Sequence, residues 1–190
     1  MKRLMTVFFS AILLLGAGGA AQAQDKYAET IDLFKNAGES ASFFGKSYGY
    51  AVFPTIGKAG LGIGGAHGSG QVYVAGKPVG ETKMTQLSFG WQAGAQGYSL
   101  MIFFEDERAF KEFTSGNFEF GAQASAVAIT AGASAGASTG AGTGAGASGG
   151  KKDAATLGDY HKGMAAFTII KGGLMYEAAI AGAKFSYKKF

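Results

Sequence analysis

Residues 87–95 alternate between two kinds of side chain. Leu87, Phe89, Trp91 and two alanines occupy every second position, and serine, glycine and glutamine lie between them. A period of two is typical of a β-strand whose two faces differ, and we expect the apolar face to be buried. The pattern therefore predicts that this chain builds a sheet.

The glycine content indicates how the strands of such a sheet are connected. It makes up 33 of the 190 residues and follows no collagen-like period. Together with many aromatic residues, this composition predicts tight turns between aromatic-rich strands. One expected hairpin joins residues 71–74 to residues 79–84 through a turn at 75–78, where Pro78 suits a turn better than a sheet ladder.

A second hairpin is expected further along the chain. Gln96-Gly97 offers a turn between residues 87–95 and residues 98–104. The latter are almost wholly apolar, which predicts a strand that is covered on both faces.

Two helices are expected beside the strands. Residues 25–36 place Ile31 and Phe34 on one face, and Gly38 follows as a stop signal. Residues 106–114 carry acidic side chains at their start, where the helix dipole favours negative charge. Strand character returns at residues 118–130, 164–170 and 174–185. The predicted fold class is α+β, a curved and mainly antiparallel sheet with two or three amphipathic helices.

The first 23 residues have the features of a secretory signal peptide. Lys2 and Arg3 precede an apolar run at residues 4–15, and Ala21-Gln22-Ala23 is a small-x-small cleavage site. The small residues 16–20 interrupt the run, which favours a signal peptide over a membrane-spanning helix. We expect cleavage after Ala23, export to the periplasm, and a single domain over residues 24–190.

Residues 131–150 consist almost wholly of alanine, glycine, serine and threonine. Side chains this small bury too little apolar surface to offset the entropy of ordering, so this stretch is predicted to be a mobile loop. A weak strand pair with a flexible tip is the alternative.

Charge and residue types exclude several kinds of function. A net charge of +4 is too small for a nucleic-acid footprint, although the basic residues are concentrated after residue 150. The chain contains no cysteine and only two histidines, His67 and His161, so neither disulfides nor a metal site are expected.

Matches to catalytic motifs lack their structural context. Residues 60–65 satisfy G-x-G-x-x-G but precede a predicted strand, whereas a dinucleotide site requires a helix. Residues 132–136 and 136–140 satisfy G-x-S-x-G only because the composition is repetitive. Glu105-Asp106-Glu107 is explained by a helix start. We therefore expect no enzyme, no catalytic residues and no cofactor.

The glycine pattern itself is specific. Residues 50–74, YAVFPTIGKAGLGIGGAHGSGQVYV, resemble the opening motif of the SYLF-domain family. Residues 88–97 resemble its second strand motif, and residues 171–174 with Ala181-Gly182 are similar to its closing motif. The resemblance runs from about Phe43 to the C-terminus and points to the secreted bacterial branch of the family.

This resemblance implies non-catalytic binding of phospholipid or a membrane surface. Lys58 and Lys171 lie within the matching glycine motifs, where backbone N–H groups can approach a phosphate closely. Together with Lys162 they are the candidate residues for an anionic headgroup. The family also implies phosphoinositide and actin binding, but residues 25–35 carry three acidic residues, and an exported protein is not expected to meet actin.

The competing function class is structural, a small outer-membrane β-barrel or another structural envelope protein. Chain length, glycine and aromatic content, and the terminal Phe190 favour it. Against it, the positions in step with Phe190 are polar, namely Lys188, Ser186 and Lys184.

Overall fold

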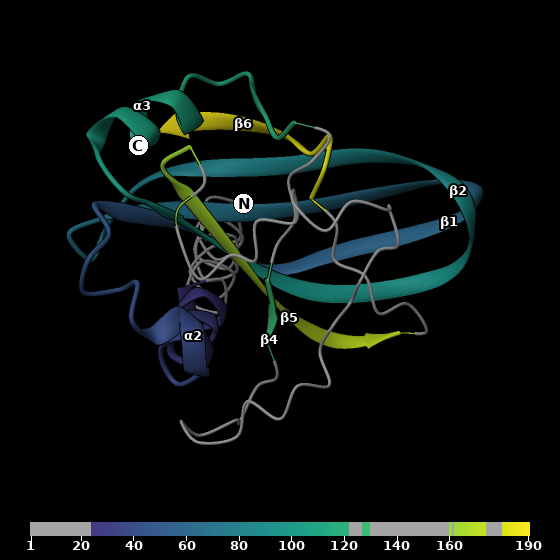
Figure 1. The fold of residues 1–190 in the computed structure, drawn as a ribbon, viewed down its shortest axis with the longest axis horizontal. Helices are drawn as coiled ribbons and strands as arrows, with labels where there is room; N and C mark the ends of the chain where they lie inside the picture. Colours follow the sequence, from purple (N-terminus) through teal and green to yellow (C-terminus); the bar gives the residue numbers. More distant parts are fainter. Residues whose placement is uncertain (1–23, 122–126, 130–159, 161, 174–179) are drawn as a thin grey trace, which may run out of the picture.

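The computed structural model describes residues 24–121, 127–129, 160, 162–173 and 180–190. The expected signal peptide and the loop at residues 131–150 lie outside these residues. Two long strands dominate, β1 (Gly49–Val74) and β2 (Lys77–Phe104), which pair antiparallel along almost their whole length. β2 sweeps round at one end of the molecule, so that the sheet is curled (Figure 1).

The remaining strands are β3 (Phe118–Glu119), β4 (Val127–Ile129), β5 (Met164–Gly173) and β6 (Lys184–Lys189). They extend the sheet from the edge of β2 that does not face β1, where β6 pairs with residues 80–85 and β5 pairs with residues 96–104. Their order is β3-β6-β2-β5-β4, with β1 on β2, and every pair is antiparallel except β4 with β5. The predicted fold class, α+β with a curved and mainly antiparallel sheet, is confirmed.

A two-residue turn joins β1 to β2. Ala75 and Gly76 both have positive φ, 50° and 75°, and Val74 pairs with Lys77 across them. Positive φ at both central residues is the conformation of a type I′ turn, whose twist matches that of the two strands. The expected turn is therefore in the right place but shorter than predicted. Pro78 belongs to β2, at a register shift, and not to the turn.

The second expected hairpin is wrong. Gln96 and Gly97 lie inside β2 and pair with Lys58 and Gly57 of β1. Gly97 does not have the positive φ that a two-residue turn demands. Because β1 is long enough to pair with both halves of β2, the chain continues straight through the Gln-Gly position.

Glycine brings the two halves of β1 together. A Cβ built on Gly70 would lie 2.6 Å from the Val52 carbonyl oxygen, and one on Gly68 would lie 2.6 Å from Cγ1 of Ile56. These distances are shorter than any real Cβ contact, so the strand approaches itself as only glycine allows. The register shifts between Leu61 and Ile63, where the strand bends back.

The sheet carries a core on each face. Even-numbered residues of β2 such as Leu100 and Phe104 form an inner core with Phe113 and Phe185. Odd-numbered residues Met101 and Phe103 form an outer core with aromatic and aliphatic side chains of the N-terminal helices and β5. Residues 98–104 are thus covered on both faces, as their unbroken apolar run predicted.

Two of the three helical segments in the described part of the chain match the expected helices. Residues 24–35 are helical, with Ile31 and Phe34 buried against the outer core. The expected stop at Gly38 is wrong in detail, because Gly38 begins the short helix α2 (Gly38–Ala41). The helix expected at residues 106–114 is α3 (Glu107–Phe113), which packs on the inner core beside β6 (Figure 1). No helix of the described residues is long and apolar enough to cross a membrane.

Candidate functional site

Lys58 lies in the interior of the curled sheet. It sits in the middle of β1, on the same face as the buried Ile56, and only 5% of its surface is exposed. Gln96 is its direct partner on β2 and is also buried. Among the described residues no hydrogen bond or ion pair reaches the Lys58 amine. The headgroup candidate Lys58 is therefore a buried residue of a strand.

Lys171 lies near the end of β5 and is exposed. Its Nζ donates a hydrogen bond of 3.3 Å to Oγ1 of Thr55, an exposed residue of β1. Thr55 points away from the face that Ile56 and Lys58 share. Lys58 and Lys171 are therefore on opposite faces of the sheet, although their strands lie close together.

Lys162 is exposed in the turn that leads into β5, with φ of 52°. β5 runs between Lys162 and Lys171, so the length of a strand separates them. The structure consequently does not gather the three candidate lysines into one site. Any headgroup contact would use Lys162 and Lys171 as separate points on the surface.

Two large aliphatic side chains are exposed together on the outer face. Leu87 is 70% exposed and Ile63 is 67% exposed. Gly65 pairs with Leu87 and Ile63 pairs with Phe89, which places Ile63 and Leu87 diagonally across the β1–β2 ladder on one face. His67 and Lys83 continue the same face along the two strands and are exposed. We call Ile63, His67, Lys83 and Leu87 the outer strip.

The position of Leu87 corrects the sequence analysis. The alternation of residues 87–95 is real, but Leu87 and Ala95 are exposed, whereas Gln86 and Gln96 are buried. On the inner side of the curl the two halves of β1 approach each other closely, as the glycine contacts show, so little room is left there for large side chains. Periodicity identifies two faces, and the direction of curling decides which of them is inside.

Basic residues flank the outer strip. Lys184 pairs in register with Thr85 and forms an ion pair of 3.5 Å with Glu119. Lys188 pairs in register with Glu81. Lys83 has no ion pair among the described residues. The excess of positive charge beside the strip is therefore small.

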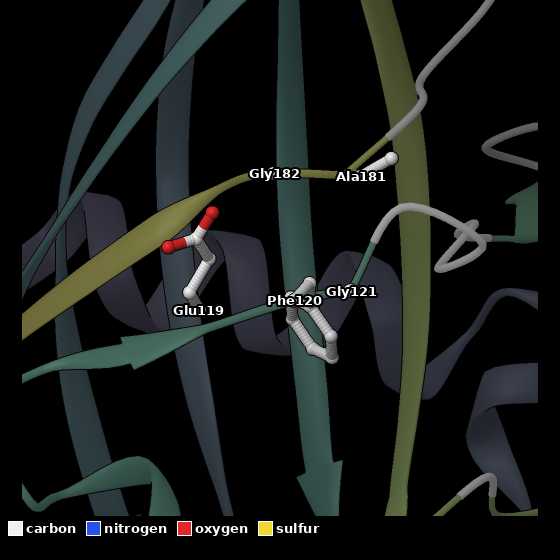
Figure 2. Close-up of a pocket in the computed structure, with 5 residues that line it drawn as sticks. All are labelled: Glu119, Phe120, Gly121, Ala181 and Gly182. Carbon is white, nitrogen blue, oxygen red and sulfur yellow. The ribbon is translucent and has the colours of Figure 1, made fainter.

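An open depression of about 460 Å³ lies where β3 meets the start of β6 (Figure 2). Glu119, Phe120, Gly121, Ala181 and Gly182 line it. The carboxylate of Glu119 forms an ion pair with Lys184, and the described lining residues include no second titratable group. This arrangement offers no acid and base pair for catalysis.

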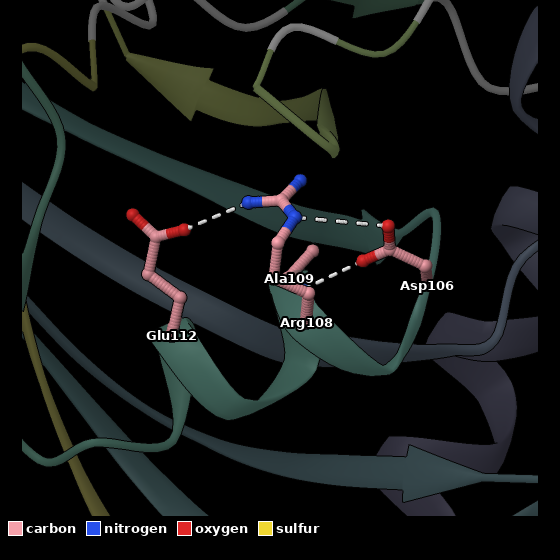
Figure 3. Close-up of polar contacts among 4 residues, drawn as sticks. All are labelled: Asp106, Arg108, Ala109 and Glu112. Carbon is pink, nitrogen blue, oxygen red and sulfur yellow. Dashed lines mark hydrogen bonds and ion pairs between the residues drawn. The ribbon is translucent and has the colours of Figure 1, made fainter.

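The carboxylate cluster before α3 serves the helix. Oδ1 of Asp106 accepts a hydrogen bond of 2.8 Å from the Ala109 N–H, which is an N-cap (Figure 3). Arg108 lies between Asp106 and Glu112 at 3.8 and 3.3 Å, and Glu107 pairs with Lys111 at 2.9 Å. The prediction that a helix start explains these residues is confirmed.

Removal of this cap is expected to destabilise the protein. Asp106→Ala should lower the free energy of unfolding by about 1 kcal/mol, because the Ala109 N–H loses its partner. Urea denaturation measures the change. Asp106→Asn keeps a capping oxygen and should lose at most half as much; an equal loss in both variants would show that charge, rather than the cap, is the cause.

The described part of the chain shows no features of a metal site or of a dinucleotide site. No group of three or more metal-ligating side chains occurs there. His67 is exposed on the outer face, and residues 60–65, the G-x-G-x-x-G match, lie within β1 without a helix after them.

Comparison with known proteins agrees with the glycine motifs. The family model described as "Las17-binding protein actin regulator" matches residues 85–189. Beta cell expansion factor A of Aeromonas veronii is 31% identical over 157 residues, which are 82% of this chain and 51% of that protein. The chain thus spans about half the length of this curated relative. Because the family model covers more than half of the chain and the relative most of it, the protein belongs to the SYLF-domain family of lipid- and actin-binding-type domains.

Proposed function

We propose that the protein is an exported, non-catalytic domain that binds phospholipid at a membrane surface through the outer strip. Family membership supports lipid binding in general. The single observation that carries the proposal is the pair Ile63 and Leu87, two large aliphatic side chains that are two-thirds exposed on adjacent strands.

Insertion of this pair into a membrane interface is energetically favourable. Full burial of an isoleucine or leucine side chain is worth roughly 1.5–3 kcal/mol. Strand residues on one face of a rigid ladder are ordered beforehand, so binding costs little conformational entropy. Two such side chains are enough for reversible attachment.

Exposed lysines give the proposed binding its preference for anionic lipid. Lys83 lies on the strip, and Lys162 and Lys171 are exposed elsewhere on the described surface. Each basic residue near an anionic membrane contributes about 1 kcal/mol, and this attraction is screened within a Debye length. Binding should therefore weaken as salt rises, while insertion of the aliphatic pair persists.

Export fits this role. We propose that residues 1–23 are a signal peptide removed after Ala23, and that residues 24–190 act as one domain in the periplasm. A domain there meets phospholipid surfaces and no actin. The actin regulation in the family description is accordingly not part of the proposed function.

Vesicle co-sedimentation tests the strip. Ile63→Ser combined with Leu87→Ser should weaken binding to vesicles of phosphatidylcholine and phosphatidylglycerol at least about tenfold, because the inserted apolar area is lost. Leu33→Ser is the matched control, since Leu33 is an exposed leucine on the N-terminal helix, and it should bind as the parent does. Equal affinity of the parent and the double variant would refute the strip as the binding surface.

The same assay tests the lipid preference. The parent should bind vesicles that contain phosphatidylglycerol more tightly than vesicles of pure phosphatidylcholine. In the double variant Lys162→Ala, Lys171→Ala the ratio of these two affinities should be smaller. Identical binding to both vesicles at low salt would remove the electrostatic part of the proposal.

A further inference from the structure

Two polar side chains without partners are buried beside a lysine on the inner face of the sheet. Lys58 is 5% exposed and Gln96 4% exposed, and Tyr98 is fully buried. The buried amide atoms of Gln96 and the Tyr98 hydroxyl lack any hydrogen-bond partner among the described residues. No ion pair within the described part of the chain includes Lys58. Buried polar groups in native proteins are almost always paired, so such a cluster requires an explanation.

The register brings the three groups to one place. Lys58 and Gln96 are direct partners across β1 and β2, where Cβ atoms are typically about 5 Å apart. Tyr98 lies two residues further along the same face of β2, opposite Ile56. Their side chains therefore share one stretch of the inner wall.

The other half of β1 faces this stretch. Gly68 lies against Ile56, and Gly60 lies against Gly64 at the bend. The residue between these contacts on the returning half is Ala66, so a small side chain faces Lys58. Gln86, the partner of Ala66, is a further buried polar side chain on this wall and donates to the Ala181 carbonyl at 2.8 Å.

Lys58 and the two unpartnered side chains beside it have the chemistry of a site for an anionic oxygen. An ammonium, an amide N–H₂ and a phenolic hydroxyl all donate hydrogen bonds, and the ammonium adds a positive charge. Burial raises the pKa of Tyr98 to about 12, so its hydroxyl keeps its proton at neutral pH. Hydrogen bonds from such donors to an ionised oxygen are stronger than bonds to a neutral acceptor.

We infer that Lys58, Gln96 and Tyr98 bind a carboxylate or phosphate group inside the curled sheet. The neighbouring inner wall is apolar, with Ile56 and Leu100 buried beside the polar groups. An acid with an alkyl chain and a free inorganic anion both supply the required oxygens. This site lies on the face opposite the outer strip. The proposed anion binding therefore does not depend on the proposed membrane binding, and each can be tested separately.

Thermal unfolding of the purified full-length protein tests the inference. We expect octanoate or inorganic phosphate, added at about ten times its Kd, to raise the Tm of the parent by roughly 3–6 °C. Lys58→Met keeps the length of the side chain and removes its charge, and it should weaken binding of the same anion at least about tenfold. Lys77→Met, an exposed lysine at the start of β2 changed in the same way, should bind as the parent does.

The choice of probe separates the two ligand sources. A Tm rise with octanoate but not with phosphate assigns the site to an acid with an alkyl chain, and a rise with phosphate assigns it to a free anion. No rise with either probe, or an equal rise in the parent and Lys58→Met, overturns the inference. If Lys58→Met fails to fold, Tyr98→Phe removes only the hydroxyl and should weaken binding several-fold.

Discussion

Replacement of Gly70 by valine is expected to lower the free energy of unfolding by about 3 kcal/mol or more. The new Cβ would lie 2.6 Å from the Val52 carbonyl oxygen and 2.7 Å from the ring of Phe53. Backbone cannot yield as a flexible side chain can, so the two halves of β1 must separate and the inner core must loosen. The Tm should fall by about 6–12 °C, as measured by calorimetry.

Gly57→Ala is the matched control for this contact. Gly57 lies in the same strand, is exposed, and has nothing within 4 Å of a built Cβ. Alanine there should change the free energy of unfolding by less than about 1 kcal/mol, and restriction of the unfolded chain favours a small gain. A large loss in Gly57→Ala, or none in Gly70→Val, would contradict the close approach of the two halves.

Phe103→Ala is expected to destabilise the protein by about 3–5 kcal/mol. Its ring lies at the centre of the outer core, with ring centroids of Phe44, Phe43 and Phe167 at 4.9, 5.4 and 5.8 Å. Truncation leaves a cavity between the sheet and the N-terminal helices and removes two edge-to-face contacts, with Phe44 and Phe167. Urea denaturation gives the free energy change.

Two further variants calibrate this loss. Phe190→Ala removes a phenylalanine that is 63% exposed and should leave the stability within about 0.5 kcal/mol of the parent. Phe103→Leu fills most of the cavity and should lose less than Phe103→Ala. Equal stability of Phe103→Ala and Phe190→Ala would mean that the helices do not depend on this face of the sheet.

Local patterns predicted the elements that depend on neighbouring residues. The 3.6-residue period of residues 25–36 identified the first helix, and acidic residues at 106–107 located the start of α3. The unbroken apolar run of residues 98–104 correctly indicated a strand with cores on both faces. In each case the signal and the structure that it describes lie within a few residues of one another.

Longer-range features escaped prediction. Gln96-Gly97 has the composition of a turn, but its conformation was decided by β1 residues nearly forty positions earlier that pair with it. Leu87 and Ala95, the two ends of the alternating stretch, were predicted to be buried but are exposed, because curling is a property of the whole hairpin. The glycines that permit it contact residues of the other half of β1.

The candidate site was predicted only in part. The glycine motifs led to the correct family and to Lys58 and Lys171, but could not reveal that the two lysines lie on opposite faces. Leu87 was predicted to be buried and Ile63 was not singled out, because an aliphatic residue in a strand pattern is ordinarily buried. Only their exposure in the folded sheet distinguishes these two side chains from the buried aliphatic side chains of the strands.

The two-residue turn at Ala75-Gly76 also has a consequence for the order of folding. From Val74 with Lys77 to Gly49 with Phe104, each pair of the β1–β2 ladder follows one that is already closed, so the ladder can grow stepwise from the turn. β6 instead pairs residues near the C-terminus with residues 80–85. It requires closure of a loop of more than half the chain, and therefore completes a sheet whose central hairpin can form before the C-terminal residues are synthesised.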